Sequence, residues 1–399
     1  MKKKILFMLI NMNVGGTEKA LLNMINEIPK EEYDITVLML EKYGGFLNSI
    51  PSHVHIEYLT GYKDIKYILN QPPHLTAVNF LKSGKVIKSM SMLLFFLLSK
   101  ILKERSLFFK YLLKGYQGNE IEYDLAVAYA GPMDFISFFV INKIKAKKKV
   151  QWIHFDVNKI GFNERFAAKI YKKFDRIFVV SNQGKDKLVS KLPFLKEKTD
   201  TFFNLISPNA IDKMAKEGIG FEDKFKGVRI LTVGRLTKEK GQDLTIPVLA
   251  KLKNSGYNVR WYCIGDGGAR KEYEDLINKN NIVNDFILLG ANTNPYPFMQ
   301  QCNIYVQPSR HEGYCITLSE AKYLNKPIIS TNFTGANEQI TNNKTGLIIK
   351  FDEIEMYNSV KKLLDDKKLR ENIIKDSRYE IISPTKEIEK FLDIVNSNN

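Results

Sequence analysis

Two glutamates frame the stretch of this sequence whose residue types and spacing could do chemistry. Glu312 and Glu320 lie in PSRHEGYCITLSE, residues 308–320, where we expect the strand Asn303–Gln307 to end in a Pro-Ser turn before a helix that begins near Thr317. Such a unit brings backbone N–H groups together at the carboxyl edge of a parallel sheet, where anions bind. Both carboxylates could then hold sugar hydroxyl groups. Alternatively, Glu320 only complements the helix dipole and Glu312 is a solvated loop residue.

Length and cysteine content limit the class of protein. A chain of 399 residues exceeds what one core usually holds, so we expect two domains. The three cysteines, Cys263, Cys302 and Cys315, are odd in number and lack metal-ligand spacing, which favours a reduced, cytoplasmic chain. The apolar run in MKKKILFMLINMN is about as long as a buried strand, and no cleavage site follows it. We therefore interpret it as the first strand.

The charge predicts an acidic partner. A formal net charge of +16 suits a nucleic acid, an anionic membrane or a phosphorylated substrate. Between Gly61 and Gly118, ten Lys or Arg residues stand against two acidic ones, around the uncharged run Ser89–Ser99. That run is too short to span a bilayer, which needs about 20 residues. Because the basic residues are not interleaved with a recognition motif, we expect no nucleic-acid partner.

Residues 82–114 make a basic amphipathic region if they form one helix. One side would carry Lys82, Lys85, Ser89, Lys100, Lys103, Glu104, Lys110 and Lys114, and the other Ile87, Met90, Leu94, Leu97, Leu98, Ile101, Leu102, Phe108, Phe109 and Leu112. The region could lie in an anionic membrane interface, or a pair of helices could cover the first domain's own core. A second basic stretch, from Lys143 to Arg176, favours a peripheral position at the inner face of the membrane.

Short apolar runs alternate with helical patterns along the chain, which predicts an α/β fold with parallel sheets covered on both faces. The alternation restarts at the strand Arg229–Val233, after a polar stretch. We therefore predict two doubly wound, Rossmann-like domains, 1–206 and 228–378, with a linker at 207–227 and a ligand cleft between them. The expected strands are Ile5–Ile10, Asp34–Leu40, His55–Leu59, Asp124–Ala130, Val150–His154, Arg176–Val180, Arg229–Val233, Val259–Ile264, Phe286–Leu289, Ile304–Gln307, Pro327–Thr331 and Gly346–Lys350.

Three glycine-bearing turns follow expected strands, and two of them are ambiguous. Gly15 and Gly16 would let a ligand approach the amino end of a helix, but a tight turn capped by Thr17 is the alternative. The segment GDGG, residues 265–268, follows the second strand of its unit and lacks the last glycine of the dinucleotide fingerprint. A nicotinamide enzyme is therefore not expected.

The remaining turn carries two cations. In GRLTKEKG, residues 234–241, Gly234 follows a strand, and Arg235 and Lys240 precede an expected helix. Cations beside the amino end of a helix suit a diphosphate far better than a neutral ligand. The turn therefore indicates a phosphorylated ligand.

The order of these motifs resembles that of the retaining glycosyltransferases of family 4, which have the GT-B fold. The motifs are GGTE, GRLTKEKG, GDGG, PSRHEGYCITLSEA with seven residues between its two glutamates, NEQI and TGLII. Residues 228–350 are most similar to the family, and residues 60–120 are unmatched. The resemblance implies a nucleotide-sugar donor held mainly by the second domain, with UDP as the expected nucleotide, and an acceptor held mainly by the first.

The resemblance also gives roles to residues of the second domain. Arg235 and Lys240 would bind the donor diphosphate and stabilise the leaving nucleotide. Glu312 would contact the transferred sugar, and Glu320 would hold the ribose. The donor-binding set implied in addition, which includes peptide N–H groups near sugar and phosphate, is Gly234, Gly313, Tyr314, Cys315 and Ile316.

The first domain would complete the site from the other side. Gly15 and Gly16 would approach the donor phosphate or the acceptor. His154, at the end of a strand, resembles a histidine that faces the sugar in many members, and a structural strand-end histidine is the alternative. The last helix, within 379–399, would cross back to the first domain, where Phe391 and Leu392 would dock.

The chemistry depends on where charge develops. Breaking the anomeric C–O bond leaves negative charge on the diphosphate, which cations and N–H dipoles stabilise. The sequence has no Asp-x-Asp motif for a metal ion, and Arg235 and Lys240 could replace that ion, so we expect neither a metal nor another cofactor. The resemblance implies retention, with the leaving phosphate oxygen accepting the acceptor's proton.

Other classes of function use parts of the same pattern. A glycosidase would use two carboxylates but not the cationic turn. A sugar-nucleotide epimerase can share the two-domain architecture, and a non-catalytic, membrane-associated protein would explain the basic region. The combined motifs favour transfer to a glycan or lipid-linked acceptor, as in bacterial surface polysaccharide assembly.

Overall fold

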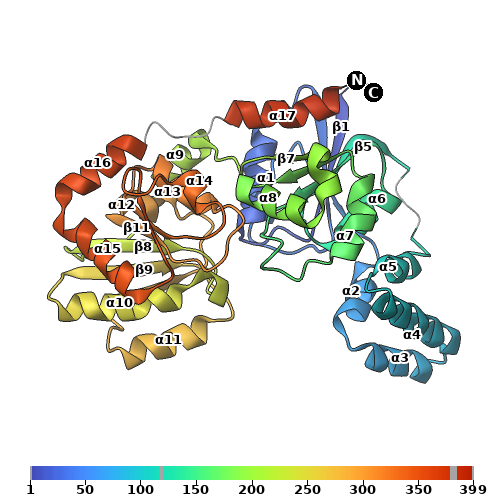
Figure 1. Cartoon of the computed structure of the whole chain (residues 1–399), viewed down its shortest axis with the longest axis horizontal. Helices are drawn as coiled ribbons and strands as arrows, with labels where there is room; N and C mark the ends of the chain where they lie inside the picture. Colours follow the sequence, from blue (N-terminus) through green and yellow to red (C-terminus); the bar gives the residue numbers. More distant parts are fainter. Residues whose placement is uncertain (1, 117–119, 378–383, 398–399) are drawn as a thin grey trace.

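The computed structural model describes residues 2–116, 120–377 and 384–397. Within them the chain forms two parallel sheets flanked by helices (Figure 1). The strand orders are β3-β2-β1-β4-β5-β6-β7 in the first domain and β10-β9-β8-β11-β12-β13 in the second. In each sheet the direction of winding reverses beside the first strand of the unit, which places a ligand crevice at its carboxyl edge. The predicted doubly wound α/β fold is confirmed.

The first sheet has a core on each face, because successive side chains of a strand point to opposite sides. Leu6 and Met8 enter one buried cluster, and Ile5, Phe7 and Leu9 enter the other. The strands are β1 (Lys3–Leu9), β2 (Tyr33–Met39), β3 (His55–Tyr58), β4 (Glu122–Ala128), β5 (Lys145–Ile153), β6 (Arg176–Val179) and β7 (Thr199–Thr201). The helices and 3-10 turns that connect them, apart from α2 to α5, are α1 (Gly16–Glu27), η1 (Leu47–Ser49), α6 (Asp134–Lys143), α7 (Glu164–Ile170), η2 (Tyr171–Lys173), α8 (Asn182–Lys191) and η3 (Pro193–Lys198).

The second sheet is likewise buried on both faces. Its strands are β8 (Val228–Val233), β9 (Val259–Ile264), β10 (Phe286–Gly290), β11 (Ile304–Gln307), β12 (Ile328–Thr331) and β13 (Leu347–Ile349). Its helices are α9 (Pro208–Lys216), η4 (Lys238–Lys240), α10 (Gln242–Asn254), α11 (Arg270–Lys279), α12 (Tyr296–Gln301), α13 (Ile316–Tyr323), α14 (Ala336–Gln339), α15 (Glu353–Asp365) and α16 (Lys367–Ser377). The predicted linker, 207–227, thus contains α9, whose Ile211 and Ala215 join a core cluster of the second domain.

The last helix, α17 (Pro384–Asn396), lies against the first domain although it follows the second in sequence (Figure 1). Phe391 is fully buried and stacks on Phe7 with ring centroids 5.7 Å apart. Ile388 and Val395 join the same cluster, and Leu392 packs against it half-buried. The predicted boundary between 378 and 379 lies outside the described residues.

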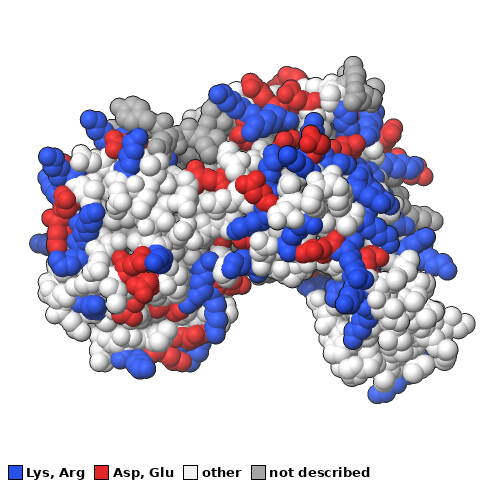
Figure 2. All heavy atoms as spheres, viewed as in Figure 1, with Lys and Arg blue, Asp and Glu red and all other residues white. Residues whose placement is uncertain are grey.

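Four helices between β3 and β4 project from the first domain (Figures 1 and 2). They are α2 (Tyr62–Asn70), α3 (Pro73–Lys82), α4 (Val86–Ile101) and α5 (Ser106–Leu112), and we call them the helical extension. The single helix considered for 82–114 is wrong. The helix α4 ends at Ile101, and Lys103 after it has a left-handed φ of 52°. None of the described helices is long and apolar enough to cross a membrane.

The two faces inferred for 82–114 are also only partly right. Ser89, assigned to the polar side, is buried and donates a hydrogen bond to the Ala77 carbonyl at 2.9 Å. Glu104, assigned to the same side, is buried and pairs with Lys169 at 3.0 Å. On the apolar side, Phe109 belongs to the first domain's core, whereas most of the apolar side chains of α4 do not.

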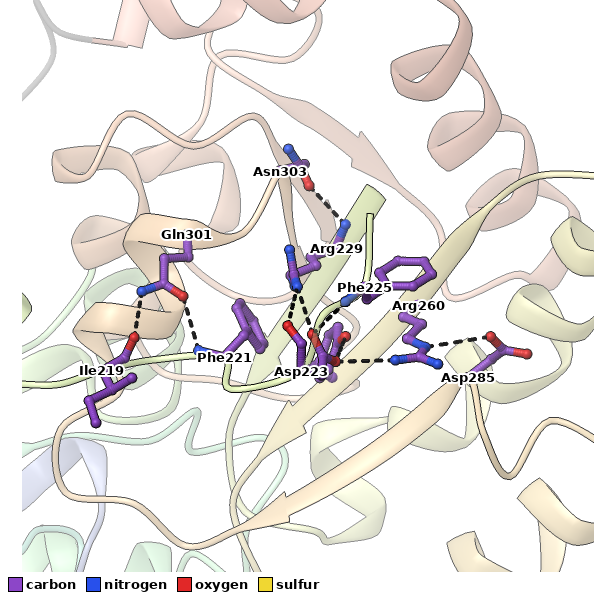
Figure 3. A network of polar contacts seen from close by, with 10 residues as sticks. Ile219, Phe221, Asp223, Phe225, Arg229, Arg260, Asp285, Gln301 and Asn303 are labelled. Atoms are coloured by element: carbon purple, nitrogen blue, oxygen red, sulfur yellow. Dashed lines mark hydrogen bonds and ion pairs between the residues drawn. The ribbon is translucent and has the colours of Figure 1, made fainter. Parts of the chain in front are cut away.

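A polar network joins the segment before β8 to the second sheet (Figure 3). Asp223 accepts hydrogen bonds from Arg229 at 2.6 Å, from Arg260 at 3.3 Å and from the Tyr262 hydroxyl. Gln301 extends the network, because its side chain bonds the Ile219 carbonyl and the Phe221 N–H. Although burial opposes ionisation, these hydrogen bonds lower the pKa of Asp223 to about 2.

We expect Asp223→Asn to lower the free energy of unfolding by about 1 to 3 kcal/mol, because the amide replaces a charged acceptor of two guanidinium groups. The pKa of Asp223 is depressed from 3.8 to about 2. The difference in free energy of unfolding between wild type and variant should therefore be largest above pH 4 and shrink as the pH falls toward 2. Urea titrations of the whole chain measure it. Asp275→Asn, which removes only an exposed pair with Lys271, is the control and should leave stability close to wild type. Equal effects of both variants would contradict the prediction.

Candidate active site

A cavity of about 590 Å³ lies between the two domains, where the carboxyl ends of β1, β5, β8 and β11 face one another. All twelve residues predicted from the sequence line it: Gly15, Gly16, His154, Gly234, Arg235, Lys240, Glu312, Gly313, Tyr314, Cys315, Ile316 and Glu320. The strand ends explain this convergence, since each of these residues follows or flanks a strand whose carboxyl end points into the crevice.

Lys240 and Glu312 form an ion pair in the cavity. The Lys240 Nζ lies 2.5 Å from the Glu312 Oε1, and that oxygen also accepts a hydrogen bond from the Ser309 hydroxyl at 2.8 Å. Burial is the largest single effect and disfavours the Lys240 charge, but the Glu312 carboxylate and, to a smaller extent, Cys315 act in the opposite direction, and the net effect raises the pKa of Lys240. Glu312 is therefore not a solvated loop residue, and Lys240 stays charged.

The loops that carry these two residues are fixed against each other. Gly241 has a φ of 70°, and a Cβ there would meet the Pro308 carbonyl oxygen at 2.1 Å. Only glycine suits both the left-handed conformation and this close approach. The turn 238–240 is thereby held beside the loop after β11.

Arg235 is the cation of the cavity that has no fixed partner. Its side chain is exposed to the cavity, and within the described parts of the chain its guanidinium makes no hydrogen bond or ion pair. Its backbone is held instead, because Gln242 donates a hydrogen bond to the Arg235 carbonyl at 3.0 Å. Positive charge is therefore available at this end of the cavity.

Glu320 is buried in the cavity wall, with 2% of its surface exposed. It accepts a hydrogen bond from the Tyr296 hydroxyl at 2.7 Å. Burial raises the pKa of Glu320, while the positive charge of Lys19 opposes that rise. Lys19 comes from α1 of the first domain and lies 5.1 Å from the centre of the Tyr296 ring. A carboxylate this buried does more than complement a helix dipole.

Lys19, Tyr296 and Glu18 are cavity residues that the sequence analysis missed. Burial lowers the pKa of Lys19 and raises that of Glu18, whose charge Arg235 stabilises from the other domain. The only sequence signal was the pair Glu18-Lys19 directly after the two glycines. Thr17 is not a cap, because α1 begins at Gly16 with Gly15 as its N-cap residue.

His154 is buried beside Tyr129 and Trp152, with ring-centre distances of 4.6 Å and 6.3 Å. Neither of its ring nitrogens has a hydrogen-bond partner among the described residues. Burial lowers the pKa of His154 to about 3, so the imidazole is neutral at physiological pH. A neutral imidazole has one nitrogen that can donate a hydrogen bond and one that can accept, and in His154 both are buried.

The amino end of α13 contributes backbone rather than side chains. The helix begins at Ile316, one residue earlier than expected, with Cys315 as N-cap. The Tyr314 ring lies 5.7 Å from the Phe203 ring of the first domain. Burial raises the pKa of the Cys315 thiol to about 12, so this thiol is not a nucleophile at neutral pH. The free N–H groups at this end favour an anion.

Gly313 lies directly against the backbone of the first domain. A Cβ at this position would lie 1.9 Å from the His154 carbonyl oxygen. Beside it, the Glu338 carboxylate accepts hydrogen bonds from the backbone N–H groups of Asn182 at 2.7 Å and Gln183 at 2.9 Å, and so caps α8 from the other domain. These contacts hold the two walls of the cavity together.

Residues 220–379 match the family model described as Glycosyl transferases group 1. The N-acetylgalactosamine-N,N'-diacetylbacillosaminyl-diphospho-undecaprenol 4-alpha-N-acetylgalactosaminyltransferase of Campylobacter jejuni is 31% identical over 210 residues, which cover 52% of this chain and 56% of that protein. The capsular polysaccharide biosynthesis glycosyltransferase CapM of Staphylococcus aureus is 29% identical over 222 residues, 51% of this chain and 56% of CapM. The chain thus spans about half the length of these curated relatives.

Solved structures match over the whole chain. The structure of Anabaena Alr3699/HepE in complex with UDP and glucose has a TM-score of 0.72 at 18% identity, covering 99% of this chain and 100% of that one. Staphylococcus aureus TarM has a TM-score of 0.69 at 15% identity, covering 99% and 100%. At this identity the likeness concerns the fold, which is the GT-B fold expected from the sequence.

We expect Gly313→Ala to force the domains apart, because the added Cβ would overlap the backbone of His154 and a backbone atom cannot rotate away. Small-angle X-ray scattering should give a larger radius of gyration for this variant than for wild type. Gly268→Ala is the control, since nothing lies within 4 Å of a Cβ built there. Identical scattering curves for Gly313→Ala and wild type would contradict the assigned contact.

His154 should make stability depend on pH. Between pH 6.5 and about 3 the folded protein keeps this histidine neutral while the unfolded chain protonates it, so acid favours unfolding. Between pH 7 and pH 5 this contribution amounts to about 2 kcal/mol, and His154→Gln should remove it from the pH dependence of urea unfolding. His74→Gln, at an exposed histidine of the helical extension, should retain the wild-type dependence. Parallel pH profiles of His154→Gln and wild type would refute the assignment.

Proposed function

We propose that this chain is a retaining glycosyltransferase of family 4 that moves a sugar from a UDP-sugar to a hydroxyl group of a glycan or lipid-linked acceptor. One observation carries the proposal: Arg235, Lys240 and the amino end of α13 meet the buried carboxylate of Glu320 in one cavity between the domains. A nucleotide sugar has an anionic centre flanked by two groups rich in hydroxyls. The presence of two cations and of carboxylates able to bind hydroxyl groups in the same cavity matches that combination of chemistry.

The comparisons support the same class of substrate. The C. jejuni relative is named for transfer to a diphospho-undecaprenol-linked sugar, and CapM for capsular polysaccharide biosynthesis. The HepE structure holds UDP and glucose. We therefore propose a cytoplasmic reaction at the inner face of the membrane, in the assembly of a bacterial surface polysaccharide.

The charges of the cavity suit the departure of a nucleotide. As the anomeric C–O bond breaks, negative charge grows on the diphosphate, and an arginine and a lysine fixed before the reaction stabilise it without reorganisation. Among the described residues Arg235 has no partner to give up, whereas Lys240 would exchange part of its contact with Glu312 for a phosphate oxygen. We propose that these two cations make a metal ion unnecessary.

The remaining residues would hold the substrates in place. Glu320 would accept hydrogen bonds from the ribose hydroxyls, with the Tyr296 hydroxyl orienting its carboxyl group and the charge of Lys19 opposing the rise in its pKa that burial causes. Glu312 would contact the transferred sugar from one side, and the neutral His154 would contact the sugar from the other side. The leaving phosphate oxygen would take the proton of the attacking hydroxyl group, which then adds to the same face and retains the anomeric configuration.

Binding of the donor is tested by a thermal-shift screen of nucleotides and nucleotide sugars. We expect UDP and UDP-sugars to raise the melting temperature, since a ligand at 100 times its dissociation constant adds about 2.7 kcal/mol to the free energy of unfolding. Stabilisation by other nucleotides but not by UDP would show that the donor carries a nucleotide other than UDP. The absence of any shift would contradict nucleotide-sugar binding, and conversion of the donor without an acceptor would indicate an epimerase.

We expect Arg235→Ala and Lys240→Ala each to lower kcat/KM for transfer about 10²- to 10³-fold, because each removes a charge from the developing diphosphate. Lys238→Ala is the matched control: this lysine belongs to the same turn, but its side chain is 78% exposed and pairs with Glu272. Activity should persist in the presence of a chelator, and NMR of the product should show the donor's anomeric configuration. Loss of activity with the chelator or an inverted product would contradict the mechanism.

A further inference from the structure

We propose that α4 forms a docking surface for an anionic lipid bilayer. This inference goes beyond sugar transfer and does not rest on it, because its observations all lie in the helical extension, outside the cavity. The occupant is the headgroup region of a membrane, into which the outer side of α4 would insert.

One side of α4 presents large apolar side chains to solvent along the whole helix. Ile87 is 83% exposed, Met90 67% and Ile101 73%, and Leu94 and Leu97 are each more than half exposed. Their spacing of three and four residues places them in one stripe. We call these five residues the apolar stripe. Figure 2 shows the surface of the helical extension as a largely uncharged area beside the highly charged body of the first domain.

The apolar stripe is not the side that holds the helical extension together. The opposite side of α4 does this, with Ser89, Met92 and Ser99 buried. Met92 packs with Ala77 of α3 and Phe108 of α5 in a small separate core. Because the inner side already satisfies the fold, an outer side in water would be expected to be polar. The apolar stripe therefore needs an apolar environment from outside the chain.

Lysines around α4 indicate which environment fits. Lys88 lies over the Phe80 ring at 4.8 Å and Lys100 over the Phe96 ring at 5.3 Å, so both charges sit beside aromatic rings next to the apolar stripe. Lys85 and Lys103 are exposed just beyond the two ends of α4. Lysines that border an inserted apolar side match the phosphates of anionic lipids. A second copy of the chain would instead bring two basic rims together.

The dimensions favour insertion in the plane of the membrane. With 16 residues, α4 is about 24 Å long, which is shorter than the roughly 30 Å of a bilayer's hydrocarbon core. The helical extension also projects from the domain (Figure 1), so it can reach a surface without unfolding. A helix that lies in the interface buries one side only, as α4 would.

Flotation of the full chain with vesicles tests the proposal. Wild type should float with phosphatidylglycerol-containing vesicles, and the double variant Met90→Glu/Leu94→Glu should bind them at least roughly tenfold more weakly, because two charges enter the apolar stripe. The matched control is Ile219→Glu/Ile354→Glu, at two exposed apolar residues of the second domain, which should bind like wild type. Unaltered melting temperatures would show that both double variants fold.

Charge-reversal variants test the electrostatic contribution to membrane binding. Lys100→Glu/Lys103→Glu should weaken binding to anionic vesicles, and Lys279→Glu/Lys344→Glu, which makes the same change of net charge in the second domain, should do so less. Binding should be weaker to pure phosphatidylcholine and at high salt. Equal binding to phosphatidylcholine, no binding by wild type, or equal loss in both stripe and control variants would overturn the proposal. So would a dimer in solution that Met90→Glu/Leu94→Glu dissociates.

Discussion

The contact between Gly313 and the backbone of His154 is the constraint on which the cavity depends. It joins the loop after β11 to the end of β5, and its geometry admits no side chain at position 313. Glu338 reinforces it by capping α8 across the domain boundary. Because the two sheets meet through their carboxyl edges, the strand ends of both domains contribute to one site. Separated domains would each keep a fold but only half of a binding surface.

Charges within the cavity are largely matched before any ligand arrives. Lys240 pairs with Glu312, which reduces the cost of holding two ionised groups in a poorly solvated place. The charge of Lys19 opposes the rise in the pKa of Glu320 that burial causes. Arg235 is the exception within the described residues. An incoming anion would thus meet the exposed guanidinium of Arg235 and would compete with Glu312 for Lys240. The same arrangement keeps Lys240 protonated over the physiological pH range.

The alternation of apolar runs and helical patterns predicted the doubly wound α/β architecture, because apolar runs followed by glycine-bearing turns mark the carboxyl ends of parallel strands. The GT-B fold and most of the residues that gather in the cavity came from the resemblance to the family 4 motifs. Their roles stay predictions. Local pattern could not give Lys19 or Tyr296, whose proximity to Glu320 depends on the packing of two domains. The local sequence pattern also failed for 82–114, because periodicity identifies the apolar side of a helix but does not show whether that side packs on the core or faces solvent. The depressed pKa of His154 likewise requires knowledge of burial.

The return of α17 to the first domain has a consequence for how the chain acquires its structure during synthesis. Phe391 fills the same core as Phe7, so the domain that begins first lacks part of its interior until residues 384–397 have left the ribosome. The second domain, by contrast, has its whole sheet encoded between β8 and β13. During translation the second domain can therefore complete its core before the first does, although most of the first is made earlier.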